Sequence, residues 1–164
     1  MTKIAGIINN SVVDGPGLRT AIFFSGCRRL CKGCHNPEAQ SFDYGKEYTL
    51  KDIENIITLS RNVGDSGITL TGGHPLEPEN YEFAQELVKQ AKEMNINVWL
   101  YTGYIFEQIP IMYMDLISMC DVVVDGPFIE HLKSDKCLYR GSTNQRLIDI
   151  QQTLDRGEII LWKE

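Results

Sequence analysis

Three cysteines fall within one short stretch of the sequence, CRRLCKGCHN at residues 27–36, with the spacing Cys27-x3-Cys31-x2-Cys34. Thiolates are soft ligands. Three of them in a tight loop can hold three corners of a cubane iron–sulfur cluster while one iron stays open to an outside ligand. An open iron favours a catalytic role over a purely structural one.

Zinc and disulfides are the other common uses of clustered cysteines. Structural zinc usually takes four protein ligands, often from two Cys-x2-Cys knuckles. A second knuckle is missing because Cys120 and Cys137 lie far apart, although His35 could serve as a fourth zinc ligand. The odd count of five cysteines, in a chain without a recognisable secretory signal, points to a reducing compartment.

Further motifs flank the cysteines on both sides: DGPGLR at residues 14–19, GCHNP at 33–37, WLYTGY at 99–104, VDGPF at 124–128 and RGSTNQR at 140–146. The cysteine spacing resembles the signature of the radical S-adenosylmethionine superfamily. Together with the flanking motifs, the chain resembles the activating proteins of anaerobic (class III) ribonucleotide reductases over nearly its whole length.

This resemblance implies a fold, two cofactors and a partner. The fold would be a single α/β domain over residues 1–164, an open partial (β/α) barrel with mostly parallel strands. Cys27, Cys31 and Cys34 would bind a 4Fe-4S cluster whose fourth iron binds S-adenosylmethionine. Reductive cleavage of that cofactor would generate a glycyl radical on the large subunit of the reductase. An electron donor such as flavodoxin or ferredoxin would supply the electron, and no catalytic residue beyond the cluster is implied.

The resemblance also assigns cofactor contacts. Gly72 and Gly73 would receive the amino-acid end of S-adenosylmethionine, Gly33 would bring backbone to the adenine, and Cys34 and His35 would lie beside the cofactor. His74 stands where the family has a carboxylate. We expect His74 to bind the ammonium through a neutral ring nitrogen, with affinity falling at acid pH. A natural variant, a weakened cofactor site and an introduced substitution remain three readings of this position.

Composition limits the class of protein. A chain of 164 residues suits one domain, and its formal charge of −6 argues against nonspecific nucleic-acid binding. No apolar run approaches the roughly 18 residues of a membrane span. We therefore expect a cytoplasmic protein without a nucleic-acid or membrane partner.

Hydrophobic periodicity predicts a βαβα alternation. Strands are expected at residues 3–8 (an edge strand), 20–24, 67–71, 96–101 and 122–124. Helices are expected at residues 49–62 with Thr49 as N-cap, from Pro78 with Met94 on the apolar face, and at 106–119 with an interruption at Pro110. The pattern leaves a doubly wound sheet and a partial barrel open, and the family resemblance implies the latter.

Two other functions remain possible from the sequence. One is an activator of another glycyl radical enzyme, such as pyruvate formate-lyase. The other is a cofactor-impaired or zinc-binding module, for which His74 is the positive evidence. Among single residues, Asp125 suits either a turn or a functional role, and Cys120 suits a core position. The role of Cys137 stays open.

Overall fold

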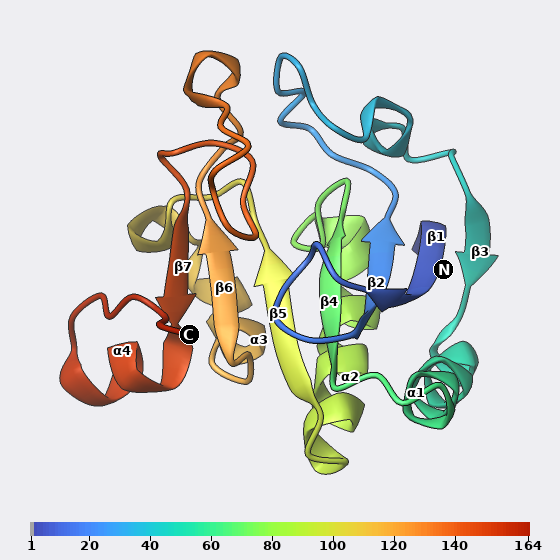
Figure 1. Cartoon of the computed structure of the whole chain (residues 1–164). Coiled ribbons are helices and arrows are strands. Elements are labelled where there is room, and N and C mark those ends of the chain that lie inside the picture. The colour runs from blue at the N-terminus through green and yellow to red at the C-terminus, as the bar shows by residue number, and fades with distance from the viewer. Residues whose placement is uncertain (1) are drawn as a thin grey trace.

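The computed structural model describes residues 2–164 and has a mixed α/β fold built on one open, seven-stranded sheet (Figure 1). The strand order is β3-β1-β2-β4-β5-β6-β7. The strands are β1 (Thr2–Ser11), β2 (Arg19–Phe24), β3 (Lys46–Tyr48), β4 (Gly67–Gly72), β5 (Asn97–Tyr101), β6 (Val122–Asp125) and β7 (Arg146–Asp149). The helices are α1 (Ile53–Asn62), α2 (Pro78–Glu93), α3 (Met114–Ile117) and α4 (Ile150–Arg156).

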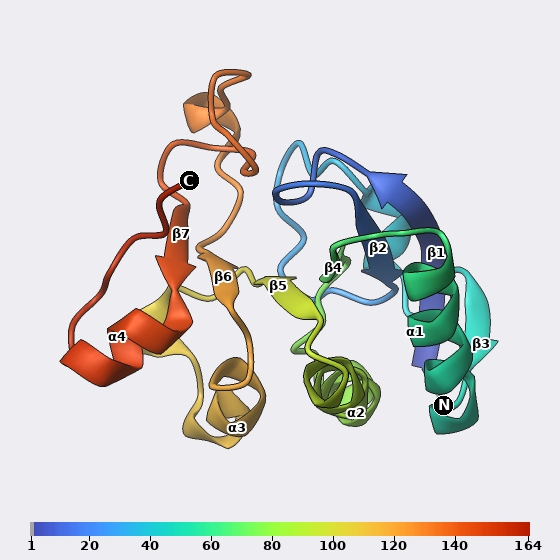
Figure 2. The ribbon, with the colours of Figure 1, turned by 60° about the horizontal axis from the view of Figure 1, so that its bottom comes forward.

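Most of the strands point in one direction. Strands β2, β4, β5 and β6 pair in parallel, whereas β1 runs antiparallel to both β2 and β3, and β7 runs antiparallel to β6. Five of the seven strands therefore share a direction. Helices α1, α2 and α3 lie along the same face of the sheet (Figure 2). This one-sided cover differs from a doubly wound sheet, which carries helices on both faces.

The four parallel strands and the first two helices match the sequence predictions, but three expectations were wrong. The first strand is not at an edge, because the short β3 pairs along its outer side. Met94 follows α2 as an exposed residue instead of lying on its apolar face. The helix expected at residues 106–119 is reduced to two 3-10 turns and the four-residue α3. Pro110 lacks an N–H and keeps Ile109 extended, which stops a continuous helix.

Helix α1 begins as its sequence predicts. The backbone N–H of Thr49 donates to the carboxylate of Asp52 at 2.7 Å, which forms a capping box with the Thr49 side chain. The first turn, Leu50–Asp52, is a 3-10 turn that leads directly into α1. No helix within residues 2–164 has the length and apolar character needed to cross a membrane.

Alternation along the strands divides the buried side chains between two clusters. The larger cluster fills the space between the sheet and the helices and includes Ile22 and Phe24 of β2. The smaller one lies on the other face and is built on Trp99, with Tyr139 and Trp162 packed edge-on against its ring. The second face is therefore covered by loop and C-terminal aromatic residues instead of helices.

Arg19 is buried on this second face, with 1% of its surface exposed. Its Nε donates to Thr69 Oγ1 at 2.9 Å, and Nη2 donates to the Ile68 carbonyl and to Asn97 Oδ1, each at 2.9 Å. Burial lowers the pKa of Arg19 to about 10. Neutral oxygens therefore satisfy this buried cation, and a side chain at Gly67 would displace its guanidinium.

Candidate functional site

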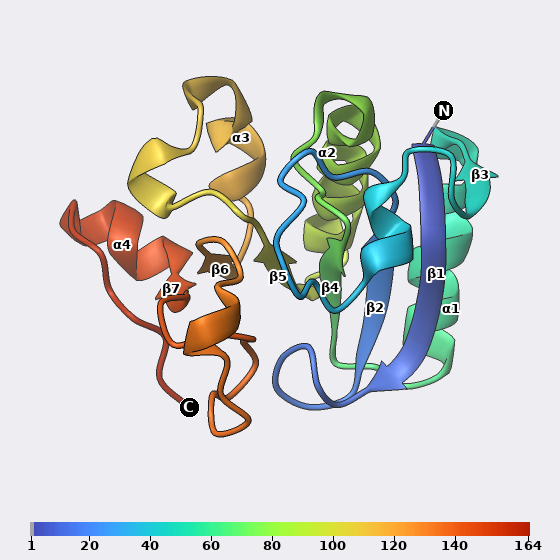
Figure 3. The ribbon, with the colours of Figure 1, turned by 90° about the horizontal axis from the view of Figure 1, so that it is seen from above.

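The carboxyl ends of the parallel strands meet at one edge of the sheet, where ligand sites of open α/β sheets generally lie. A cavity of about 710 Å³ opens there. Figure 3 looks onto this edge and shows the loop after β2 and the segment after β6 both lying over it. The cavity is lined by residues near the ends of three strands, Phe23, Thr71 and Tyr101, by the loops that follow them, and by parts of the β1–β2 loop and of the segment after β6. Parallel strand direction thus brings distant segments of sequence into one site.

The loop after β2 delivers all three clustered thiols to this cavity. Cys27, Cys31 and Cys34 line it, and none of them forms a disulfide. Leu30 has a left-handed φ of 49°, and the Cys34 N–H donates to the Cys31 carbonyl at 3.2 Å, so the loop turns tightly between its ligands. The pKa of the Cys27 thiol is raised, mainly because the thiol is partly buried. Three soft ligands from one compact loop are suited to an iron–sulfur cluster with an open position.

Backbone hydrogen bonds from Gly73 and His74 connect the end of β4 to the start of this loop. The Gly73 N–H donates to the Phe24 carbonyl at 2.6 Å, and the His74 N–H donates to the Gly26 carbonyl at 2.9 Å. A Cβ at Gly73 would lie 2.6 Å from the Ala39 carbonyl oxygen, and Gly72 has a φ of +96°. Both glycines line the cavity. Their lack of side chains is therefore required by the protein's own packing.

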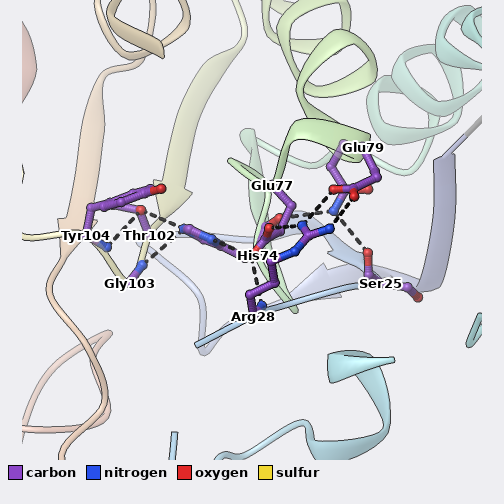
Figure 4. A network of polar contacts seen from close by, with 9 residues as sticks. Ser25, Arg28, His74, Glu77, Glu79, Thr102, Gly103 and Tyr104 are labelled. Carbon is purple, nitrogen blue, oxygen red and sulfur yellow. Dashed lines mark hydrogen bonds and ion pairs between the residues drawn. The ribbon is translucent and has the colours of Figure 1, made fainter. Parts of the chain in front are cut away.

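The His74 ring is held by protein atoms on both sides (Figure 4). It lines the cavity but is only 3% exposed. Nε2 lies 2.8 Å from Thr102 Oγ1 and accepts the Gly103 N–H at 3.3 Å. Thr102 Oγ1 already accepts the Tyr104 N–H, so its own proton is free to point at Nε2. This arrangement places the ring proton on Nδ1, which faces Glu77 Oε1 at 3.5 Å. Neither ring nitrogen is left without a protein partner.

Glu77 is the main site residue that the sequence reasoning missed. It is 5% exposed at the start of α2. Its Oε1 accepts the backbone N–H of Arg28 at 2.8 Å, and its Oε2 pairs with Arg28 Nη1 at 2.6 Å. Burial alone would raise the pKa of Glu77, but the contact with His74 and the hydrogen bonds from Arg28 lower it to about 2. An acidic residue three positions after His74 was the available signal.

Glu77 also lies close to a cluster ligand. Ligand atoms of Cys27, His74 and Glu77 are all within 4.8 Å of one another. A second carboxylate, Glu79, pairs with the same Arg28 guanidinium from the solvent side, at 2.5 Å. Figure 4 shows the guanidinium between the two carboxylates. Two anions and one cation leave this network with a net charge of −1.

The two other residues expected to contact the cofactor point in different directions. Gly33 turns toward Glu130, whose carboxylate would lie 2.8 Å from a Cβ at this position. His35 lines the cavity and packs against Phe128, with ring centroids 4.9 Å apart. The cysteine loop thereby touches the segment that follows β6. These contacts close one side of the cavity.

The segment at residues 140–146 is a folded wall of the cavity. Gln145 Oε1 accepts the N–H groups of Gly141 and Ser142, and its Nε2 donates to the Gly126 carbonyl at 3.1 Å. Arg140 and Gln145 both line the cavity. The motif therefore shapes the site from the β6 side.

Three further residues were singled out from the sequence: Cys120, Cys137 and Asp125. Cys120 is fully buried beside Leu116, as expected of a core residue, whereas Cys137 lines the cavity. Asp125 is 1% exposed and accepts the N–H groups of Phe106 and Arg146. Its carboxylate also pairs with the Arg146 guanidinium, so Asp125 connects the loop after β5 to β7.

Comparison with known proteins adds a family to this geometry. A family model described as a 4Fe-4S single cluster domain matches residues 13–148, which include the cysteine loop and most of the cavity. A protein of enterobacteria phage T4 is 36% identical over 137 residues, covering 82% of this chain and 86% of the relative. A protein of Escherichia coli K12 is 34% identical over 139 residues, covering 82% and 90%. One from Vibrio cholerae is 36% identical over 138 residues, covering 82% and 89%. All three relatives carry the name anaerobic ribonucleoside-triphosphate reductase-activating protein.

Proposed function

The chain belongs to the family of anaerobic ribonucleoside-triphosphate reductase-activating proteins, and we propose from this membership that it generates a glycyl radical on an anaerobic ribonucleotide reductase. The observation that carries the proposal is the set of three unpaired thiols from one loop, lining a cavity at the carboxyl edge of the sheet. The partner is the large subunit of the reductase, which presents a glycine-bearing loop to this cavity.

The donor set fits a 4Fe-4S cluster that takes S-adenosylmethionine as a second cofactor. Three thiolates from Cys27, Cys31 and Cys34 would hold the cluster and leave one iron open. When bound and reduced, this pair of cofactors supplies a 5′-deoxyadenosyl radical that takes a hydrogen atom from the partner's glycine. The chain's own residues position the reactants and shield them from water.

Residues that line the cavity, together with Gly33 beside it, would supply the remaining contacts of S-adenosylmethionine. Gly72 and Gly73 would offer backbone to its amino-acid end, and His35 would lie beside its ring system. Gly33 would contribute backbone from the outer side of the loop. Because both nitrogens of His74 have protein partners, we assign His74 a supporting role. The net charge of −1 on the neighbouring carboxylate network would then favour the ammonium group.

The finer features of the family complete this proposal. The curved, mostly parallel sheet would be the partial barrel of the radical S-adenosylmethionine type. A small one-electron carrier such as flavodoxin or ferredoxin would reduce the cluster. The cytoplasm is the location that suits five unpaired cysteines.

A zinc-binding module is a second candidate because Cys27, His74 and Glu77 place three different ligand atoms close together. This set joins a thiolate, an imidazole and a carboxylate, all of which zinc accepts. Metal analysis separates the two candidates. A colourless protein with one zinc would favour the module, and a brown protein with iron and acid-labile sulfide would favour the activase.

Anaerobic reconstitution tests the proposed function directly. The chain is loaded with iron and sulfide, reduced with dithionite in the presence of S-adenosylmethionine, and assayed for 5′-deoxyadenosine. Electron paramagnetic resonance then follows the cluster signal, and a reductase is added to look for a glycyl radical. Formation of the nucleoside and of the glycyl radical supports the proposal. A reconstituted cluster that yields neither product contradicts it.

A further inference from the structure

One carboxylate connects three separate segments in a second pocket, which shares Arg29 and His74 with the cavity. Glu77 Oε1 accepts the backbone N–H of Arg28, and Oε2 pairs with the side chain of the same residue. The same Oε1 also faces Nδ1 of His74 at 3.5 Å. Glu77 itself belongs to the turn that starts α2. The cysteine loop, the end of β4 and the start of a 16-residue helix are therefore joined at a single buried group.

The bonded N–H belongs to the peptide that follows a cluster ligand. A buried, ionised acceptor makes a stronger hydrogen bond than a neutral one, so Glu77 fixes the plane of the Cys27–Arg28 peptide. Arg28 also packs its guanidinium over the ring of Phe42, 4.5 Å from the ring centroid. Phe42 in turn occupies the space that a side chain at Gly26 would need. The position of Cys27 is thus held by contacts on both of its neighbours.

The same carboxylate places a negative charge beside the cluster ligand. Its oxygen and the Cys27 sulfur belong to a group of atoms within 4.8 Å of one another, and the Glu77 side of this group is buried. The reduction potential of an iron–sulfur cluster depends on nearby charge, on hydrogen bonding and on solvent exposure. Reduction adds one electron, so a fixed neighbouring anion disfavours the reduced form.

We propose that Glu77 is a positioning residue for the cluster, which fixes Cys27 and holds the reduction potential of the cluster low. This inference rests on the cluster proposed at Cys27, Cys31 and Cys34. A low potential makes the reduced cluster a stronger one-electron donor. Glu77 would therefore serve the reaction without touching the substrate or the reacting atoms.

The chain offers a matched control for this proposal. Glu79 pairs with the same guanidinium as Glu77 but is an exposed side chain, 47% accessible to solvent, and it is not among the atoms grouped around Cys27. Solvent screens its charge. Comparing Glu77→Gln with Glu79→Gln removes one carboxylate from each side of Arg28 and separates the effect of the buried charge from loss of the ion pair.

The experiment is an anaerobic redox titration of the reconstituted holoprotein, followed by electron paramagnetic resonance. Glu77→Gln is expected to shift the midpoint potential in the positive direction, and Glu79→Gln is expected to keep the wild-type value. Arg28→Met removes the cation and keeps the backbone N–H. Because the Arg28 side chain is 58% exposed, solvent screens its charge, and the potential is expected to change less than in Glu77→Gln. Equal potentials in wild type and Glu77→Gln, or an equally large positive shift in Glu79→Gln, would overturn the role in the potential.

A second readout needs no cluster. In the cluster-free chain, alkylation of Cys27 by iodoacetamide is followed by mass spectrometry. Glu77→Gln is expected to speed this modification several-fold, with Glu79→Gln unchanged, because only the first substitution weakens the hydrogen bond that holds the Arg28 peptide. Unchanged alkylation in Glu77→Gln would refute the positioning role even if that variant binds no cluster. Failure of the wild type to bind a cluster would refute the proposed function instead.

Discussion

Nδ1 of His74 lies 3.5 Å from Oε1 of Glu77, and both side chains are almost completely buried. A carboxylate at position 74 would therefore face a second carboxylate in a water-poor site, where like charges repel. We expect His74→Glu to lower the free energy of unfolding by about 1–3 kcal/mol. Urea denaturation of the cluster-free chain measures this. Exchanging the two residues, as His74→Glu with Glu77→His, should recover the part of the loss that comes from repulsion, although the contacts of Glu77 with Arg28 are lost. A fully stable His74→Glu single variant would contradict the pairing.

The three cysteines of the loop should be necessary for the cluster, and Cys137 should not be. Replacing Cys27, Cys31 or Cys34 by serine removes a soft ligand, so the iron and acid-labile sulfide bound after reconstitution should fall sharply. Cys137→Ser is the matched control because Cys137 lines the same cavity. Loss of iron in Cys137→Ser would indicate a fourth thiolate ligand and a closed cluster, in conflict with an open iron.

Gly73 should not tolerate even a methyl group. A Cβ there would lie 2.6 Å and 2.7 Å from the carbonyl oxygens of Ala39 and Gly26, which belong to backbone and cannot move aside cheaply. We expect Gly73→Ala to cost about 1–3 kcal/mol of unfolding free energy and to weaken cluster assembly. Gly6→Ala is the control, because a Cβ at Gly6 meets no atom within 4 Å. Similar denaturation midpoints for the two variants would contradict this packing argument.

Asp125 should matter for stability because it is a buried partner of Arg146. Asp125→Asn removes the charge that faces the guanidinium. We expect the free energy of unfolding to fall by about 2–3 kcal/mol, less than for a fully buried pair, because the Arg146 side chain is partly exposed. Glu107 binds the same guanidinium from an exposed position, so Glu107→Gln should cost less than about 1 kcal/mol. Chemical denaturation of both variants checks the contrast. The reverse order would mean that the exposed pair dominates.

Asp65 should contribute a pH-dependent part of the stability. Burial opposes its charge, but hydrogen bonds from Thr20 and Asn10 prevail and lower its pKa below the ordinary value of 3.8. A lowered pKa gives stability that is present above pH 3.8 and is lost as the pH falls below it. Denaturation midpoints between about pH 5 and about pH 3 should therefore fall more steeply in wild type than in Asp65→Asn. Parallel curves would show that this carboxylate is not the source.

The sequence predicted the parallel strands well because each of them is an apolar run bounded by turn residues. It also placed the three cysteines in the loop at the carboxyl end of β2, because they directly follow the apolar run that predicts this strand. Strand β7 escaped prediction because Arg146–Asp149 is short and has only two apolar residues between two charged ones, too few to show a period, and pairing with β6 decides its structure. Pro110 was recognised as an interruption, but its effect on the whole segment around it was underestimated.

The site was harder to predict where it depends on distance between segments. The place of Gly72 and Gly73 at the end of β4 could be predicted from the sequence, and their contact with a cofactor stays a prediction. The contact between Glu77 and Arg28 joins residues 49 positions apart, and the sequence contains no periodicity that would pair them. His74 shows the same limit. Its neighbours Thr102 and Gly103 follow the end of another strand. The hydrogen-bond partners of its ring nitrogens can therefore be known only once the sheet is assembled.

The buried Arg19 layer bears on the order in which the proposed cofactor and partner would bind. Trp99 and Arg19 fill the second face of the sheet below the level of Phe23, Thr71 and Tyr101, where the cavity begins. The cavity therefore ends at buried side chains on this side, and it opens toward the carboxyl edge and toward the exposed loop residues Val12 and Val13. A macromolecular partner that covers both the edge and this loop would also cover the route of a small cofactor. In the proposed reaction, S-adenosylmethionine would then be loaded before the reductase docks, and its cleavage products would leave after the reductase has moved away.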